Sequence, residues 1–277
     1  MMKSPFLRMV ALVLPLFLGV PAAISGSYNQ DFTGVSSGST SLGDGSAIAS
    51  NDGIASVQGA GNPYLRMTRN NTGSTASSFR LPDLDPGQAI DSFTATFDLQ
   101  IGGSGAFADG VSLTFGAIPG GNGGGEAGFA ADNGLTVAWD TYNNGGTDPP
   151  SIEIFSDGVS VNNRTHDYGS TAGDWVAVVL RWDESGLDLT YDGTAIASNL
   201  PTPGFAPAAG DRFAFSGRTG GLNQNTYLDD LSFTTTTDSP STTGGPVITE
   251  FIADNEDTLG DEDIDSPDWL EIYNGQD

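Results

Sequence analysis

The chain has 277 residues, including 39 Gly and 15 Pro, and its 35 acidic residues against nine basic ones give a net charge of −26. So few cations exclude binding to a phosphate backbone and argue against docking on anionic lipid. The absence of Cys excludes disulfides and thiolate metal sites, and a single His, His166, argues against His-rich zinc sites and Ser–His–Asp triads.

Residues 1–25 are predicted to be a secretory signal peptide. Lys3 and Arg8 precede an apolar run at residues 9–20, and small residues follow at 21–25. The apolar run is shorter than the ~20 residues that a membrane-spanning helix needs. We therefore expect an exported mature chain without membrane insertion, and the alternative is an uncleaved N-terminal anchor.

Residues 26–236 are predicted to form one all-β sandwich of the jelly-roll type. Apolar residues alternate through residues 91–101, which places Phe93, Phe97 and Leu99 on one face. Further strands are predicted at residues 110–116, 135–141, 151–155, 175–182, 187–191, 212–216 and 227–234. Many short strands separated by Gly, Asn, Asp and Pro favour a sandwich or jelly roll.

Residues 237–246 are predicted to be a linker, because Thr, Ser, Gly and Pro dominate the segment. The strand pattern restarts at residue 247 and continues to residue 277. Thirty-one residues are too few to bury a core of their own. We expect residues 247–277 to be the start of a truncated second module.

Residues 137–148 offer a set of oxygen ligands. Asp140, the carbonyl of Tyr142, the amide oxygen of Asn144 and Asp148 fall within nine residues. Calcium takes six to eight oxygen ligands, so this segment is a candidate first shell for Ca²⁺. An ordinary turn rich in Asn, Gly and Asp is the alternative.

Three segments, residues 107–115, 120–125 and 137–148, resemble those of the L-type (legume-type) lectins, which have the concanavalin A-like jelly-roll fold. The resemblance implies that Asp109 accepts two sugar hydroxyls and follows a cis peptide bond from Ala108. It implies that a backbone N–H of Gly124 or Gly125 donates to the sugar. The remaining implied roles are those of Asn144, in both calcium and sugar binding, and of Asp140, Tyr142 and Asp148 as calcium ligands.

Two positions depart from the lectin pattern. Ala138 stands where the family has the Glu of its transition-metal site, and Glu153 falls about where the family has a metal-binding His. We therefore expect calcium alone as the cofactor.

Residues 213–233 resemble the penultimate strand, specificity loop and closing strand of this fold. Gly220, Gly221 and Asn223 are expected beside Asp109, with a plain hairpin loop as the alternative.

Residues 248–275 resemble the start of a lamin-tail domain, an immunoglobulin-like sandwich found in many secreted bacterial proteins. The resemblance rests chiefly on the Asp-Trp-Leu-Glu-Ile-Tyr-Asn segment at residues 268–274. It covers the first strands of that domain only. The chain is thus interpreted as a bacterial extracellular lectin-like module followed by a partial lamin-tail-like module.

The chain is predicted not to be an enzyme. Glycoside hydrolases of this fold class use two carboxylates across the sugar, and typically carry a Glu-x-Asp-x-x-Glu strand, which is absent here. Glu126, Glu153 and Glu184 are interpreted as isolated surface acids. The sequence thus predicts a secreted, calcium-dependent carbohydrate-binding module of a larger extracellular protein, with a polysaccharide or glycan as partner. A structural or adhesive sandwich without a sugar site is the alternative, and a glycoside hydrolase is the third interpretation.

Overall fold

The computed structural model describes residues 26–102, 107–123, 125, 128–129, 134–146 and 148–237, and the backbone of 246–252 and 269–274. One compact unit ends at Thr237, and a second unit includes the chain from Asp238 onward. The described part of the chain holds no helix with the length and apolar character that crossing a membrane requires.

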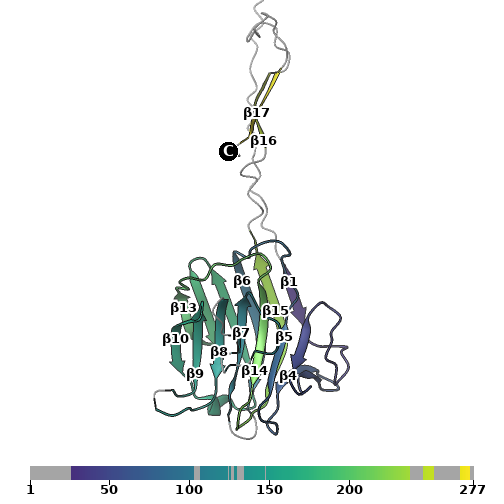
Figure 1. Ribbon diagram of the computed structural model, residues 1–277, viewed down its shortest axis with the longest axis vertical. Coiled ribbons are helices and arrows are strands. Elements are labelled where there is room, and N and C mark those ends of the chain that lie inside the picture. The colour runs from purple at the N-terminus through teal and green to yellow at the C-terminus, as the bar shows by residue number, and fades with distance from the viewer. Residues whose placement is uncertain are drawn as a thin grey trace, which may run out of the picture. The chain divides into compact units, whose positions relative to one another are not determined.

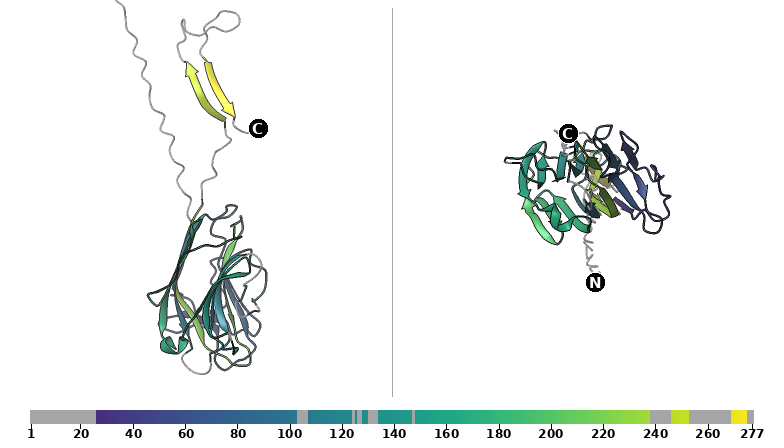
Figure 2. Two further views of the ribbon diagram at one scale, coloured as in Figure 1. Left: turned by 90° about the vertical axis from the view of Figure 1, so that its left-hand side faces the viewer. Right: turned by 90° about the horizontal axis from the view of Figure 1, so that it is seen from below.

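The first unit consists of two antiparallel sheets packed face to face (Figures 1 and 2). The eight-stranded sheet has the order β13 (Thr194–Leu200), β12 (Gly186–Tyr191), β11 (Trp175–Asp183), β6 (Ser92–Ile101), β15 (Thr226–Thr236), β4 (Tyr64–Thr68) and β3 (Ser56–Gln58), with β1 (Ser27–Gln30) paired to β15. The seven-stranded sheet has the order β10 (Val159–Thr165), β9 (Ser151–Ser156), β8 (Gly134–Asp140), β7 (Gly110–Gly116), β14 (Arg212–Arg218), β5 (Ala76–Arg80) and β2 (Ala47–Ser50). Neighbours distant in sequence, such as β6 with β15 and β7 with β14, give the crossed connections of a jelly roll.

The predicted all-β sandwich is confirmed, and all eight strands predicted from the sequence are present. In β6 half-buried and buried positions alternate from Ser92 to Ile101, as expected for a strand with one face on the core. The strands that the prediction missed include β2, β3, β10 and β13, which close the edges of the two sheets. Edge strands such as β10 are largely exposed and polar, so they lack the apolar alternation that reveals a strand.

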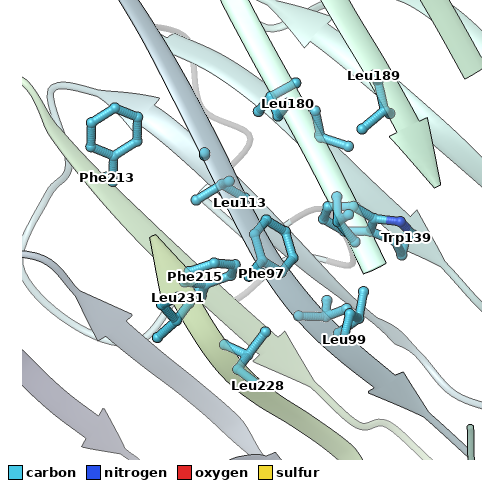
Figure 3. Close-up of a cluster of buried hydrophobic side chains, with 14 of the residues drawn as sticks. Phe97, Leu99, Leu113, Trp139, Leu180, Leu189, Phe213, Phe215, Leu228 and Leu231 are labelled. Atoms are coloured by element: carbon cyan, nitrogen blue, oxygen red, sulfur yellow. The ribbon is translucent and has the colours of Figure 1, made fainter. Parts of the chain in front are cut away.

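The core fills the space between the sheets (Figure 3). Phe97 of β6 packs edge-on against Phe215 of β14, with ring centroids 4.9 Å apart, and against Trp139 of β8, at 5.9 Å. All three side chains are at most 2 % exposed. Burying a large apolar side chain contributes about 1.5–3 kcal/mol, so contacts such as these fix the position of β8 and β14.

The described part of the second unit is one hairpin. Strand β16 (Pro246–Ile252) pairs antiparallel with β17 (Trp269–Asn274). Most of the predicted linker and residues 253–268 lie outside the described residues. The lamin-tail resemblance therefore stays a prediction, as does the signal peptide at residues 1–25, which also lies outside them.

A short 3₁₀ helix, η1 (Tyr168–Thr171), connects β10 to β11. The side chain of Asp167 caps it by accepting a hydrogen bond from the backbone N–H of Gly169 at 2.9 Å. The hydroxyl of Tyr168 donates to the carbonyl of Ser151 at 2.7 Å and ties this turn to the start of β9. The turn thereby supports the end of the seven-stranded sheet at which the candidate site lies.

Candidate metal and carbohydrate site

Four neighbouring strands of the seven-stranded sheet, β9, β8, β7 and β14, have ends that lie side by side, and this end of the sheet is called the site edge. Gly110, at the start of β7, pairs with Asp140 of β8 on one side and with Arg218 of β14 on the other. Asp140 in turn pairs with Ser151, at the start of β9. Residues far apart in the sequence therefore meet here, and the predicted Asp109 and Asp140 are among them.

Backbone contacts on both sides fix the position of Asp109. Its N–H donates to the carbonyl of Arg218 at 3.0 Å, and its own carbonyl accepts from the N–H and the hydroxyl of Thr141 at 2.9 and 3.0 Å. The peptide bond from Ala108 to Asp109 is cis, as the lectin resemblance implies. The Asp109 side chain is thus set between β14 and the loop that follows β8.

The Asp109 carboxylate is buried beside a cation. The residue is 5 % exposed, and Nε of Arg218 lies 3.2 Å from Oδ2. Burial raises the pKa of Asp109, and the Arg218 charge partly offsets that effect. Oδ2 nevertheless accepts no hydrogen bond from the described residues. An acceptor without a donor is what a ligand hydroxyl would satisfy.

The loop after β14 covers this carboxylate. A Cβ placed on Gly220 would stand 2.8 Å from Oδ2 of Asp109 and 2.9 Å from Oδ1, so a larger residue would force the carboxylate or the loop to move. The N–H of Ser74 holds the Gly220 carbonyl at 3.0 Å. Gly221 is exposed with open space at its Cβ position, and Asn223 is half-buried. The structure thus puts Gly220 against Asp109, with the other two predicted loop residues just beyond it.

A buried amide that sequence reasoning missed, Gln224, connects Asp109 to the loop after β8. Its Oε1 accepts from the N–H of Ala108 at 3.1 Å and from the hydroxyl of Thr141 at 2.8 Å. Its Nε2 donates to the hydroxyl of Thr226 at 3.3 Å. Gln224 is fully buried, yet nothing in the polar segment around it distinguishes it from its neighbours.

The Gly-rich loop packs on the same sheet against Ser78 and Ser216, whose side chains are buried. The hydroxyl of Ser78 donates to the carbonyl of Gly121 at 3.1 Å, and a Cβ on Gly123 or Gly128 would clash with Ser216. Gly125 forms an isolated bridge with Gly128. Gly124, the other residue predicted to donate to a sugar, lies outside the described residues.

Three carboxylates gather where β8 ends and β9 begins. Asp140, Asp148 and Glu153 each present a ligand atom within 4.8 Å of the others. Asp140 is 5 % exposed, and the other two are half-buried. Asp140 is the last residue of β8, Asp148 lies on the β8–β9 connection and Glu153 lies on β9, so the turn between the two strands brings the three together.

The predicted ligand residues of this turn are close to the cluster. The amide nitrogen of Asn144 donates to Oδ2 of Asp148 at 3.0 Å, and the N–H of Tyr142 donates to Oδ1 of Asp140 at 3.0 Å. The interpretation of Glu153 as an isolated surface acid is wrong. Glu153 faces Ala138 across the strand pair and reaches the two Asp side chains, which only the β8–β9 register brings near.

The donor set fits a hard cation. Carboxylate, amide and carbonyl oxygens suit Ca²⁺, whereas transition metals favour imidazole or thiolate ligands. Among the described residues, the only His, His166, does not lie in the cluster formed by Asp140, Asp148 and Glu153. Its ring packs edge-on against Tyr168 and Tyr191, with centroids 4.7 and 5.1 Å apart, and burial lowers its pKa.

No protein-family model matches the chain, and no curated protein is found to be similar to it. Several solved structures, in contrast, are similar to this chain. Peanut lectin with a nine-residue peptide is 23 % identical, with a TM-score of 0.56 over 77 % of this chain and 98 % of that one. The fold is that of the legume lectins.

Two further solved structures extend the likeness. The lectin from Bauhinia forficata in complex with GalNAc is 18 % identical, with a TM-score of 0.56 over 78 % of this chain and 100 % of that one. The exoplasmic/lumenal domain of VIP36, in its Ca²⁺/Man-bound form, is 17 % identical, with a TM-score of 0.50 over 75 % and 88 %. At these identities the likeness establishes the fold, the concanavalin A-like β-sandwich, and function must come from the site itself.

Proposed function

We propose that this chain is a secreted, calcium-dependent, carbohydrate-binding module of a larger extracellular protein. One observation carries the proposal. The carboxylate of Asp109 is buried, its Oδ2 accepts no hydrogen bond from the described residues, and it lies at the same sheet edge as a carboxylate cluster suited to calcium. The legume-lectin fold and the sugars in the GalNAc and Ca²⁺/Man-bound structures support the same conclusion.

In this proposal the ionised Asp109 accepts hydrogen bonds from two sugar hydroxyls. Arg218 supports the ionised form because its positive charge, 3.2 Å away, opposes the cost of burying a carboxylate. Gly220 has no side chain, so the loop approaches the carboxylate there with its backbone alone. A charge-assisted hydrogen bond is worth about 1.5–3 kcal/mol, so this residue would carry much of the affinity.

Asp140, Asp148, Asn144 and the carbonyl of Tyr142 would hold the calcium ion, whose positive charge would keep these oxygens close together. The metal-binding loop is connected to Asp109 by hydrogen bonds from Thr141. Thr141 directly follows Asp140, and its N–H and hydroxyl both donate to the carbonyl of Asp109. Ordering of the metal loop therefore fixes the acceptor that the sugar needs, which explains why sugar binding would depend on calcium.

We infer that the ligand is a neutral glycan or polysaccharide. With a net charge of −26, the surface repels anionic polymers at a distance. A neutral ligand experiences no such repulsion, and its hydroxyls offer the hydrogen-bond donor that Oδ2 of Asp109 lacks among the described residues.

The test is glycan binding to the wild type and to Asp109→Ala, on an array with calcium and with a chelator. The substitution removes two charge-assisted hydrogen bonds, so binding should weaken by about 2–4 kcal/mol. Calcium should raise the melting temperature of both proteins equally, because Asp109 is not a metal ligand. Asp174→Ala, at an exposed Asp, serves as the matched control and should bind normally.

An Asp109→Ala variant that binds glycans like the wild type would contradict the proposal. The chain would then be better described as a structural or adhesive sandwich whose Asp-rich turn binds calcium alone. Release of reducing sugar from a polysaccharide would instead favour the glycoside hydrolase interpretation.

The extracellular setting is part of the proposal. Cleavage of a signal peptide near residue 25 is expected, and the N-terminal sequence of the exported protein would check it. Residues 247–277 are proposed as the start of a lamin-tail-like module, separated by the linker at 237–246. Limited proteolysis should then cut within the linker and leave the sandwich intact.

A further inference from the structure

Three aromatic side chains meet on the outer face of the eight-stranded sheet, the sheet opposite that of Asp109. Trp175 begins β11, Tyr64 begins β4, and Tyr227 lies near the start of β15. Their ring centroids are 4.8 Å (Tyr64–Tyr227), 5.8 Å (Tyr64–Trp175) and 6.4 Å (Trp175–Tyr227) apart. We propose that this aromatic triad is a second carbohydrate-binding surface, which needs no metal and stacks against the sugar rings of a neutral, β-linked polysaccharide.

The strand register explains why the rings face solvent. Gln100 of β6 pairs with Trp175 on one side and with Tyr227 on the other, so these side chains share one face of the sheet. The next residues along the two strands, Val176 and Leu228, are buried in the core. Trp175 is 38 % exposed, and no other large apolar side chain in the described strands of this sheet is as exposed. An exposed aromatic cluster of this kind marks a binding surface.

The polar ends of the triad are free to bind a ligand. Among the described residues, the hydroxyls of Tyr64 and Tyr227 and the indole N–H of Trp175 find no hydrogen-bond partner. By contrast, the hydroxyl of Tyr168 and Nε1 of Trp182 both donate hydrogen bonds within the sandwich, at 2.7 and 3.0 Å. Burial raises the pKa of Tyr227, so its hydroxyl keeps the proton and can donate it. Rings with an apolar body and an unpaired polar end suit a ligand that offers both kinds of surface.

A sugar ring matches both features of the triad. The two faces of a β-linked glucose unit carry axial C–H groups, and its hydroxyls project around the rim. The C–H groups can contact the negative face of an aromatic ring, while the hydroxyls reach the polar ends beside it. The planes of the three rings are tilted by 44°, 53° and 66° to one another, so a flat crystalline surface cannot contact them all. A single soluble polysaccharide chain can follow the tilted rings.

A second copy of this chain is the other occupant that a sheet face can take, and both size and charge argue against it. A standard interface buries about 800 Å² on each partner around an apolar centre. Beside the triad, the outward positions of β6 are all polar, namely Ser92, Thr94, Thr96, Asp98 and Gln100. Each copy also carries a net charge of −26, which repels another copy and anionic polymers alike. A neutral ligand of small footprint fits this face better.

The triad should bind weakly and independently of Asp109. An open surface encloses less of a ligand than a pocket does, so we expect a Kd on the order of 1 mM. The triad shares no residue with the metal region or with the surroundings of Asp109, so this inference goes beyond the proposed function. At such an affinity the triad alone leaves no signal on a glycan array. The array therefore reports on Asp109, and a method suited to weak binding is needed for the triad.

The experiment is affinity electrophoresis of the full chain in native gels that contain hydroxyethyl cellulose or mixed-linkage β-glucan, with a chelator throughout. Both polymers are neutral, and the wild type should be retarded by them. Trp175→Ala leaves the charge unchanged and should weaken binding by about tenfold or more, as truncation of a central aromatic contact does. Trp175→Phe keeps a ring and should lose less. Val159→Ala shortens an apolar side chain that is 62 % exposed on the other sheet, and this matched control should migrate like the wild type.

Four results would overturn the inference. They are a wild type that neither polymer retards, a Trp175→Ala variant that is retarded like the wild type, a Trp175→Ala variant that loses its fold, and a dimer that Trp175→Ala dissociates in sedimentation. The third would make the triad cross-strand packing alone, and the fourth would assign the face to a second copy. Tyr227→Phe separates these roles, since it keeps the packed ring and should still weaken binding a few-fold through the lost hydroxyl.

The proposed function fails by a different result. Asp109→Ala should be retarded in the chelator gels like the wild type, because the triad is intact. Loss of retardation in that variant would place the weakly bound sugar at Asp109 and would also overturn the inference. A glycan-array signal that Asp109→Ala leaves unchanged would contradict the calcium-dependent site and would leave the result of the gels as it stands.

Discussion

Two acidic regions lie where β7, β8, β9 and β14 end or begin, one at Asp109 and one at Asp140, Asp148 and Glu153. Their negative charge is compensated in different ways. Asp109 is a single carboxylate, and the adjoining strand supplies Arg218 at 3.2 Å. Asp140, Asp148 and Glu153 are three carboxylates within 4.8 Å, where each pair repels by about 3 kcal/mol at an effective dielectric constant of ~20. One side chain can balance one charge. No cationic side chain belongs to the cluster of three, so the fold balances the charge of the first region and leaves that of the second to the cation that we propose.

The regions are nonetheless connected. Thr141 adjoins the carboxylate cluster and donates to the Asp109 carbonyl, and the buried Gln224 accepts from both Thr141 and Ala108. Substitutions in the metal region should therefore affect both metal and sugar binding, whereas substitutions around Asp109 should affect sugar binding alone. This asymmetry can be tested directly.

The largest effect is expected from Asp140→Ala. The substitution removes a charged ligand, so the calcium-dependent rise in stability, about 2.7 kcal/mol at a calcium concentration 100 times Kd, should disappear. Glycan binding should disappear with it, because Thr141 no longer holds Asp109. Calorimetric melting curves with calcium and with a chelator provide the measurement, and Asp174→Ala is the control. A calcium response that survives in Asp140→Ala would show that the metal binds elsewhere.

A smaller effect is expected from Gly220→Ala. The new Cβ would stand 2.8 Å from Oδ2 of Asp109, so the carboxylate or the loop must move, at a cost of about 1–3 kcal/mol in unfolding free energy. Glycan binding should weaken while calcium affinity stays at the wild-type value. Gly221→Ala meets open space and is the matched control. Urea denaturation and calcium titration of the two variants give the comparison, and equal behaviour of both would mean that Gly220 does not constrain Asp109.

The smallest effect is a shift in pH dependence in Arg218→Met. Asp109 accepts sugar hydroxyls only when ionised, so binding falls as the pH drops through its pKa. Burial already raises that pKa above its ordinary value of 3.8, and removing the Arg218 charge raises it further. Glycan binding in Arg218→Met should therefore be lost at a higher pH than in the wild type. Arg181→Met, at an exposed Arg of β11, should keep the wild-type midpoint, as would Arg218→Met if the ion pair were unimportant.

The sequence by itself determined the sandwich, because apolar alternation in strands such as β6 reports directly which face is buried. It also indicated Asp109, Asp140 and Asp148, since each lies in a short segment whose order resembles that of the lectins. Local segments suffice where the neighbours that matter are near in the sequence. The Asp140–Asp148 turn is of this kind, with Asn144 and Asp148 in contact across four residues.

Only the tertiary structure decided which distant residues join these segments. Arg218 reaches Asp109 because β14 pairs with β7, and Gln224 reaches Ala108 although 116 residues separate them. Glu153 enters the carboxylate cluster because the β8–β9 register sets it opposite the small Ala138. Strand pairing is a long-range property, fixed when the two sheets bury their faces together, and a single strand's sequence does not specify its partner or register.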